Sequence, residues 1–125
     1  SIAPKAGRRK GSRPVYSFSI ASSSLLEKPR FVIDAVHVAG QAGMKDFQPS
    51  AITRNPHSGS FFVLSSKSRL IAEIEPHGGA LLGVRKLSPA YHPQPEGIAF
   101  LGGDSLLIGN EGLLHGTISV YGMRQ

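Results

Sequence analysis

A short segment that recurs 46 residues along the chain constrains the fold more than any other feature. Residues 48–53 (QPSAIT) reappear in altered form as residues 94–99 (QPEGIA). In each copy a turn follows, and then an apolar run, at residues 61–65 in the first copy and 105–109 in the second. A period of roughly 40 to 50 residues is typical of chains built from repeated supersecondary units.

The repeat reads as a series of short strands. After residues 61–65 come apolar segments at 70–74 and 81–87, so the first copy predicts four strands. The second copy supplies a third strand at 117–121, in which Ile118 and Val120 share one face and Thr117, Ser119 and Tyr121 the other. Residues 15–20 and 31–35 resemble the third and fourth strands of an earlier repeat. With 15 Gly and 9 Pro spread along the chain, helical periodicity is weak, and we predict an all-β fold.

Four antiparallel strands per repeat of about 45 residues are typical of a β-propeller blade. Half a blade, one full blade and three further strands make about two and a half blades, whereas closed propellers usually have roughly 4 to 8. We therefore predict a partial β-propeller. Its remaining blades would come from the same propeller or from another copy of the chain, since an open arc leaves strand edges exposed. A β-sandwich is the alternative, because alternation and turns alone do not separate the two.

The charge is concentrated at the N-terminus. Of the net +6, five positive charges lie in residues 1–13, at Lys5, Arg8, Arg9, Lys10 and Arg13, and the rest of the chain is close to neutral. We assign residues 1–13 to a basic loop or tail and residues 14–125 to the propeller. A solvated loop is favoured over a phosphate-binding arm, so nucleic-acid binding is not the leading interpretation.

Two absences narrow the function classes. The sequence has no cysteine, which excludes disulfides, thiolate metal sites and a cysteine nucleophile. It also has no apolar run of the roughly 20 residues that span a bilayer, and no signal-peptide pattern. Because the chain starts at Ser1 rather than Met, we expect a processed or truncated product.

Three motifs carry a resemblance to a known family. They are SSKSRLI at residues 65–71, PQPEGIAF at 93–100 and IGNEG at 108–112. Together they resemble the SdiA-regulated family, bacterial six-bladed propeller-like proteins that are often exported or membrane-anchored. The resemblance covers residues 14–121 and implies the C-terminal portion of such a propeller, in the periplasm or cell envelope. Two positions depart from the family pattern: Ala51 replaces a common Gly, and residues 101–103 replace a DPDG turn.

Glu96 is the leading metal-ligand candidate. It lies at the predicted start of an innermost strand, where strand ends converge on a propeller axis, and Asn110 and Glu111 follow the next strand. Related six-bladed propellers, including lactonases and phosphotriesterases, hold Ca²⁺ on axial carboxylate and amide oxygens, which suits the oxygen ligands that Ca²⁺ prefers. The resemblance thus implies a candidate Ca²⁺ site at Glu96, Asn110 and Glu111. Alternatively, Glu96 caps backbone N–H groups of its own turn.

Ser65, Arg69 and His92 are the predicted ligand-binding residues. Arg69 could meet an anionic ligand, although a salt bridge with Glu111 or Asp46 is favoured. His92 is the histidine nearest the PEG motif and a conceivable general base, but a solvated loop histidine is favoured, since no Ser or Asp completes a triad around it. None of the five histidines has metal-ligand spacing.

The leading functional prediction is an exported propeller that binds a small-molecule ligand through its axial face, with Ca²⁺ as the candidate cofactor. Whether it is an enzyme stays open. The first alternative is a Ca²⁺-dependent phytase-like or lactonase-like hydrolase. The second is binding of nucleic acid or an acidic surface by the basic N-terminal segment. Fold class alone does not decide among them.

Overall fold

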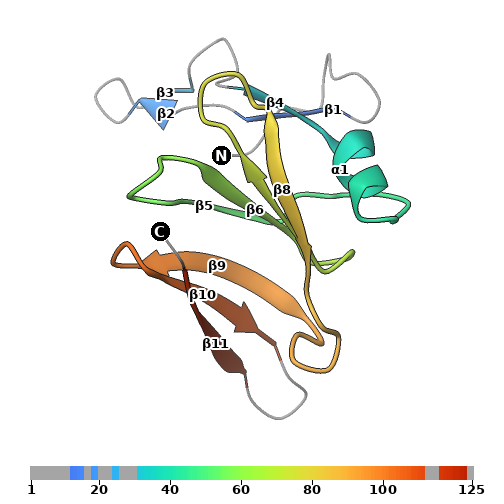
Figure 1. The fold of residues 1–125 in the computed structure, drawn as a ribbon, viewed down its shortest axis with the longest axis vertical. Helices are drawn as coiled ribbons and strands as arrows, with labels where there is room; N and C mark the ends of the chain where they lie inside the picture. The colour runs from blue at the N-terminus through green and yellow to red at the C-terminus, as the bar shows by residue number, and fades with distance from the viewer. Residues whose placement is uncertain (1–11, 16–17, 20–23, 26–30, 112–115, 124–125) are drawn as a thin grey trace.

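The computed structural model describes residues 12–15, 18–19, 24–25, 31–111 and 116–123 (Figure 1). All paired strands in these residues are antiparallel, and the one helix among them is short, which confirms the predicted all-β class. The elements are β1 (Ser12–Val15), β2 (Phe18–Ser19), β3 (Ser24–Leu25), β4 (Phe31–Asp34), α1 (Ala35–Gln41), β5 (Ala51–Arg54), β6 (Phe61–Ser65), β7 (Leu70–Ile74), β8 (Leu81–Lys86), β9 (Pro95–Leu101), β10 (Ser105–Asn110) and β11 (Thr117–Gly122).

The first copy of the repeat forms one four-stranded sheet in which consecutive strands are neighbours, in the order β5-β6-β7-β8. Its two outer hairpins have similar loops, residues 55–60 and 75–80. In each loop the first residue donates its N–H to the carbonyl of the last and accepts from a glycine N–H, Gly59 or Gly79. Both glycines have positive φ, 76° and 78°, a conformation that favours glycine. The predicted four strands are therefore confirmed.

The second copy forms a three-stranded sheet in the order β11-β10-β9, as its three predicted strands require. The strands that open the two copies, β5 and β9, lie against each other, and β9 also contacts β6 (Figure 1). Each copy of the repeat therefore forms one meandering sheet, and the two sheets pack against each other. Closure of these sheets into a ring is not seen in the described residues.

The N-terminal region forms a separate layer. β1 pairs with β4, and β2 pairs with β3. Of the strand predicted at 15–20, Val15 lies in β1 and residues 18–19 form β2, while residues 16, 17 and 20 lie outside the described residues. β1 begins at Ser12, so the last two residues of the predicted basic tail are in a strand. Lys5, Arg8, Arg9 and Lys10 lie outside the described residues.

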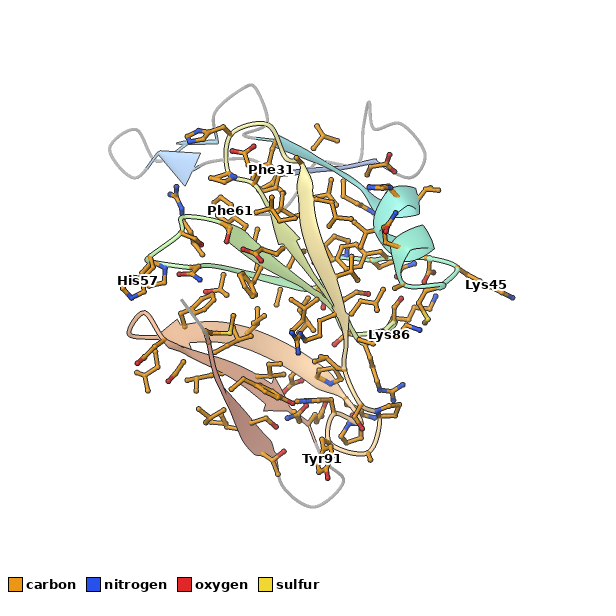
Figure 2. The ribbon with its side chains drawn as sticks, viewed as in Figure 1. Phe31, Lys45, His57, Phe61, Lys86 and Tyr91 are labelled. Carbon is orange, nitrogen blue, oxygen red and sulfur yellow. The ribbon has the colours of Figure 1, made fainter. Side chains whose placement is uncertain are left out.

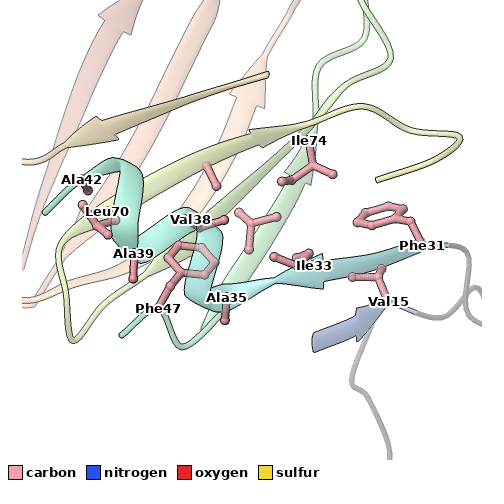
Figure 3. Packing of buried hydrophobic residues seen from close by; sticks show 12 residues of the cluster. Val15, Phe31, Ile33, Ala35, Val38, Ala39, Ala42, Phe47, Leu70 and Ile74 are labelled. Carbon is pink, nitrogen blue, oxygen red and sulfur yellow. The ribbon is translucent and has the colours of Figure 1, made fainter. Parts of the chain in front are cut away.

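The helix α1 was not predicted. It follows β4 directly, and the carboxylate of Asp34 caps it by accepting the N–H of His37 at 3.0 Å. Its buried residues, Ala35, Val38 and Ala39, face the core (Figure 3). The helix has only seven residues, too few to show a full amphipathic stripe, which explains why periodicity missed it.

A first hydrophobic core fills the space between the N-terminal layer and one face of the four-stranded sheet (Figure 3). Phe31 of β4 meets Phe61 of β6, with ring centroids 5.1 Å apart (Figure 2). Phe47, from the loop after α1, is 1% exposed in the same cluster. Burial of such aromatic side chains stabilises the packing of one layer on the next.

A second core lies between the other face of the four-stranded sheet and the three-stranded sheet. Phe62 meets Phe100 edge to face, with ring centroids 5.1 Å apart and planes at 88°. The other buried members are Leu64, Ile71, Leu87, Leu106 and Ile108. Both faces of the four-stranded sheet are therefore covered, and the two sheets of the repeat share an apolar interior.

Candidate functional site

The connection between β8 and β9 is fixed by Arg69, which lies in the β6–β7 turn with φ at 52°. Its Nε donates to the carbonyl of His92 at 2.8 Å, and its Nη2 donates to the carbonyl of Pro93 at 2.7 Å. Two bonds from one planar guanidinium to successive carbonyls fix the direction in which residues 92 and 93 enter β9.

Ser65 and Asp46 hold the entry to β5 at the same end of the sheet. Ser65 is fully buried, and its Oγ accepts the N–H groups of Gln48 at 3.3 Å and Ser68 at 3.4 Å. Asp46 accepts the Ser68 hydroxyl at 3.1 Å and forms a surface ion pair with Lys67 at 3.5 Å. In the part of the chain that is described, Asp46 therefore forms its ion pair with Lys67, and the guanidinium of Arg69 bonds to backbone carbonyls instead of the favoured salt bridge with Asp46.

His92 is completely buried, with 0% exposure, so the prediction of a solvated loop histidine is wrong. Its Nδ1 lies 2.8 Å from Oδ1 of Asn110, and its Nε2 is hydrogen-bonded to the hydroxyl of Tyr121. The imidazole and phenol rings also lie close, with centroids 5.7 Å apart. The carbonyl bond from Arg69 and these two ring bonds together explain why a polar loop residue is buried at a sheet junction.

The hydrogen-bond network determines which ring nitrogen carries the proton. The amide Nδ2 of Asn110 donates to the carbonyl of Ile108 at 3.3 Å and to Oγ of Ser119 at 3.2 Å. Oδ1 of Asn110 is therefore an acceptor facing His92, and Nδ1 of the neutral imidazole must be the donor. Nε2 is left as an acceptor, so the Tyr121 hydroxyl donates to it.

The three predicted metal ligands lie in different surroundings. Opposite the single step from Gly109 to Asn110, β9 advances two residues, from Gly97 to Pro95, so Glu96 is the extra residue of a β-bulge. Glu96 and Glu111 are both exposed, whereas Asn110 is 4% exposed and its amide is bonded to buried partners. No group of three His, Asp or Glu side chains with metal-binding geometry occurs among the described residues. Calcium binding at this end of the sheets stays a prediction.

A groove of about 710 Å³ runs between the outer strands of the two sheets. Its floor belongs to the second core, and its walls include Arg85 and Lys86 of β8 and Tyr121 of β11. Arg85 is the pairing partner of Ile71 and so lies on the face of the sheet that looks toward β11. Tyr121 pairs with Leu106 and lies on the facing side of the other sheet. The phenol that bonds to His92 is therefore part of the groove wall.

Arg85 is the cation whose side chain faces the groove. Glu73 also lines it, but its Oε2 accepts the hydroxyl of Ser60 at 2.6 Å. Arg85 and Lys86 are both exposed, but Lys86 is the pairing partner of Leu70, a residue of the first core, so its side chain lies on the face of β8 turned away from β11. The site therefore combines an apolar floor, the cation of Arg85, the hydrogen-bonded carboxylate of Glu73 and the phenol of Tyr121.

Sequence reasoning placed Tyr121 on a strand face with Thr117 and Ser119 but gave that face no role. The structure turns this polar face inward, where Ser119 and Tyr121 contact Asn110 and His92. The signal was the unusual pattern of β11, in which the apolar residues occupy the face opposite the tyrosine. The pairing with His92, 29 residues earlier, could not be read from spacing.

Comparison of the chain with models of protein families, with curated proteins and with solved structures finds no match. In the described part of the chain, no helix is both long and apolar enough to cross a membrane.

Proposed function

We propose that the groove between β8 and β11 binds a small amphipathic anion. The observation that carries this proposal is the cavity of about 710 Å³ whose floor is apolar and whose wall carries Arg85 and Tyr121. An apolar chain would cover the floor, where removal of apolar surface from water favours binding by roughly 25 cal/mol per Å². A volume of this size is within the range of small-molecule sites.

The polar groups of the groove wall indicate which head group the ligand carries. The guanidinium of Arg85 matches a carboxylate, with which it can form two parallel hydrogen bonds. The Tyr121 hydroxyl donates its hydrogen bond to Nε2 of His92, so the phenol oxygen has lone pairs with which to accept a hydrogen bond from the ligand. The matching ligand is an amphipathic carboxylate that also carries a hydroxyl or amide N–H.

Fluorescence titration with dansyl-labelled undecanoate tests this function. The probe should bind, be displaced by 3-hydroxydecanoate, and lose roughly tenfold in affinity in Arg85→Gln, a change of about 1.4 kcal/mol. Lys45→Gln, at an exposed lysine on the loop after α1 (Figure 2), is the control and should bind as the unmodified chain does. Equal binding by both variants, or no binding at all, would contradict the proposal.

At the level of architecture, we propose that the two meandering sheets are neighbouring blades of a larger propeller-like assembly. The contact between β5 and β9, the strands that open the two copies of the repeat, supports this arrangement. The remaining blades would come from the rest of the propeller or from another copy of the chain. A periplasmic or cell-envelope location, the Ca²⁺-dependent hydrolase and nucleic-acid binding stay predictions based on the sequence.

A further inference from the structure

We propose that Asn110, His92 and Tyr121 form a proton relay in which Tyr121 acts as a nucleophile toward activated esters. The inference rests on the groove of the proposed function being open to small molecules. It adds a reaction to that site, with an acyl donor as the class of substrate.

The relay has the parts that an activated nucleophile needs: a hydroxyl, a base within hydrogen-bonding distance and a third group that orients the base. The Tyr121 hydroxyl is bonded to Nε2 of His92, and Nδ1 of His92 is bonded to Asn110 at 2.8 Å. Asn110 is in turn fixed by Ile108 and Ser119. The orientation of the base therefore depends on two further bonds inside the sheet.

Access distinguishes the three members of the relay. His92 and Asn110 are buried, at 0% and 4% exposure, whereas Tyr121 is 39% exposed and lines the groove. Tyr121 is therefore the member of the relay that a reagent in the groove can contact. Arg85, on the facing wall, is a cation available to the carbonyl oxygen of an acyl donor.

The reaction balances without an added oxidant or reductant. The phenol oxygen of Tyr121 attacks the carbonyl carbon of the ester while its proton moves to Nε2 of His92. The bond between the carbonyl carbon and the leaving oxygen then breaks, which gives an acetyl ester on Tyr121 when p-nitrophenyl acetate is the donor, and releases p-nitrophenolate. Water then attacks the carbonyl carbon of the acetyl ester, the bond from that carbon to the Tyr121 oxygen breaks, acetate and the protons of the water leave to solvent, and the Tyr121 oxygen takes back the proton held on Nε2 of His92.

The chain contains its own control in Tyr91, which is 75% exposed on the β8–β9 connection (Figure 2). If exposure alone sets reactivity, p-nitrophenyl acetate should acetylate Tyr91 faster than Tyr121. If the relay acts, Tyr121 should react at least about tenfold faster, since general-base catalysis contributes roughly 10²- to 10⁴-fold. Peptide mapping by mass spectrometry gives both rates in one sample of the unmodified chain.

Variants separate the role of each member. His92→Gln should lower the Tyr121 rate to that of Tyr91, and Tyr121→Phe should abolish the fast phase of p-nitrophenolate release. Asn110 is a positioning residue, so Asn110→Asp, which keeps an acceptor for Nδ1, should retain more of the preference for Tyr121 than Asn110→Ala. Tyr91→Phe should leave the Tyr121 rate unchanged.

A Tyr121 rate equal to or below that of Tyr91 in the folded, unmodified chain would overturn the relay, and this comparison needs no variant to fold. The outcome is separate from that of the binding function. Fast acetylation without binding of the undecanoate probe would leave the relay standing and remove the binding proposal. Binding of the undecanoate probe without fast acetylation of Tyr121 would contradict the relay and leave the binding proposal standing.

Discussion

At the scale of single residues, hydrogen bonds to backbone atoms fix side-chain positions that the sequence patterns did not predict. Arg69 has a left-handed backbone conformation, with φ at 52°, which is uncommon for residues other than glycine. Its guanidinium bonds to the carbonyls of residues 92 and 93, and these bonds offset the cost of the conformation. An arginine predicted to meet a ligand thus has a structural role that positions His92.

Glu75 provides a prediction of pH dependence. Its carboxylate accepts the N–H groups of Gly78 and His77, at 2.5 and 2.7 Å, and these two bonds, the Gly78 bond first, lower the pKa of Glu75 below its ordinary value of 4.5. A lowered pKa in the folded state stabilises the fold above pH 4.5, and this contribution is lost as the pH falls through the lower folded value. Glu75→Gln should therefore flatten the acid side of the curve of unfolding free energy against pH.

A substitution at Asn55 should change the pH dependence of stability in the direction opposite to Glu75→Gln. Its Oδ1 accepts the N–H groups of His57 and Ser58 in the equivalent loop, but an amide does not titrate in this range. Asn55→Asp should therefore steepen the acid side of the curve by placing a carboxylate on the same donors. Urea denaturation at several pH values measures both variants, and parallel curves for all three proteins would contradict the assignment.

At the scale of elements, the two similar hairpin loops differ in their surroundings, and a matched pair of substitutions exposes the difference. Both Gly59 and Gly79 have positive φ, so alanine at either position costs about 1 to 2 kcal/mol. A Cβ at Gly79 would also lie 3.0 Å from Cβ of Phe31 and from the carbonyl of Val32, whereas at Gly59 the nearest atom is Nη2 of Arg54 at 3.6 Å. Gly79→Ala should therefore destabilise the chain by about 1 kcal/mol more than Gly59→Ala.

Chemical denaturation of both variants measures this difference. Gly83→Ala, where an added Cβ meets nothing within 4 Å, is the control and should change the unfolding free energy least. Equal losses at residues 59 and 79 would show that the β7–β8 loop does not pack on β4.

The strands were predicted best from the sequence, because strand alternation and glycine turns are local signals. The four strands of the first repeat and the three of the second follow from them. The helix after Asp34 did not, since seven residues carry too little periodicity. The contacts of His92 with Asn110 and Tyr121 are long-range, joining a loop to two strands, and composition or spacing contains no signal for them.

At the scale of the whole molecule, the layers are unequally covered. The four-stranded sheet packs on both faces, against the N-terminal layer and against the three-stranded sheet. The three-stranded sheet has one covered face, and its outer face carries Leu101, Ile118 and Val120 at 64%, 70% and 63% exposure. In the described residues, its edge strand β11 pairs with β10 alone.

An apolar sheet face next to an unpaired edge strand favours association with another sheet, because burial of the face and pairing of the edge both lower the free energy. We therefore expect the isolated chain to self-associate in a concentration-dependent way, measurable by sedimentation velocity. Replacing Ile118 and Val120 together with Lys should give a monomer with little change in unfolding free energy, because both side chains are exposed in the single chain. Leu82→Lys, at an exposed leucine of β8, is the control and should leave association unchanged. A monomer at all concentrations of the unmodified chain, or equal loss of association in the control, would show that this face is not where a neighbouring sheet binds.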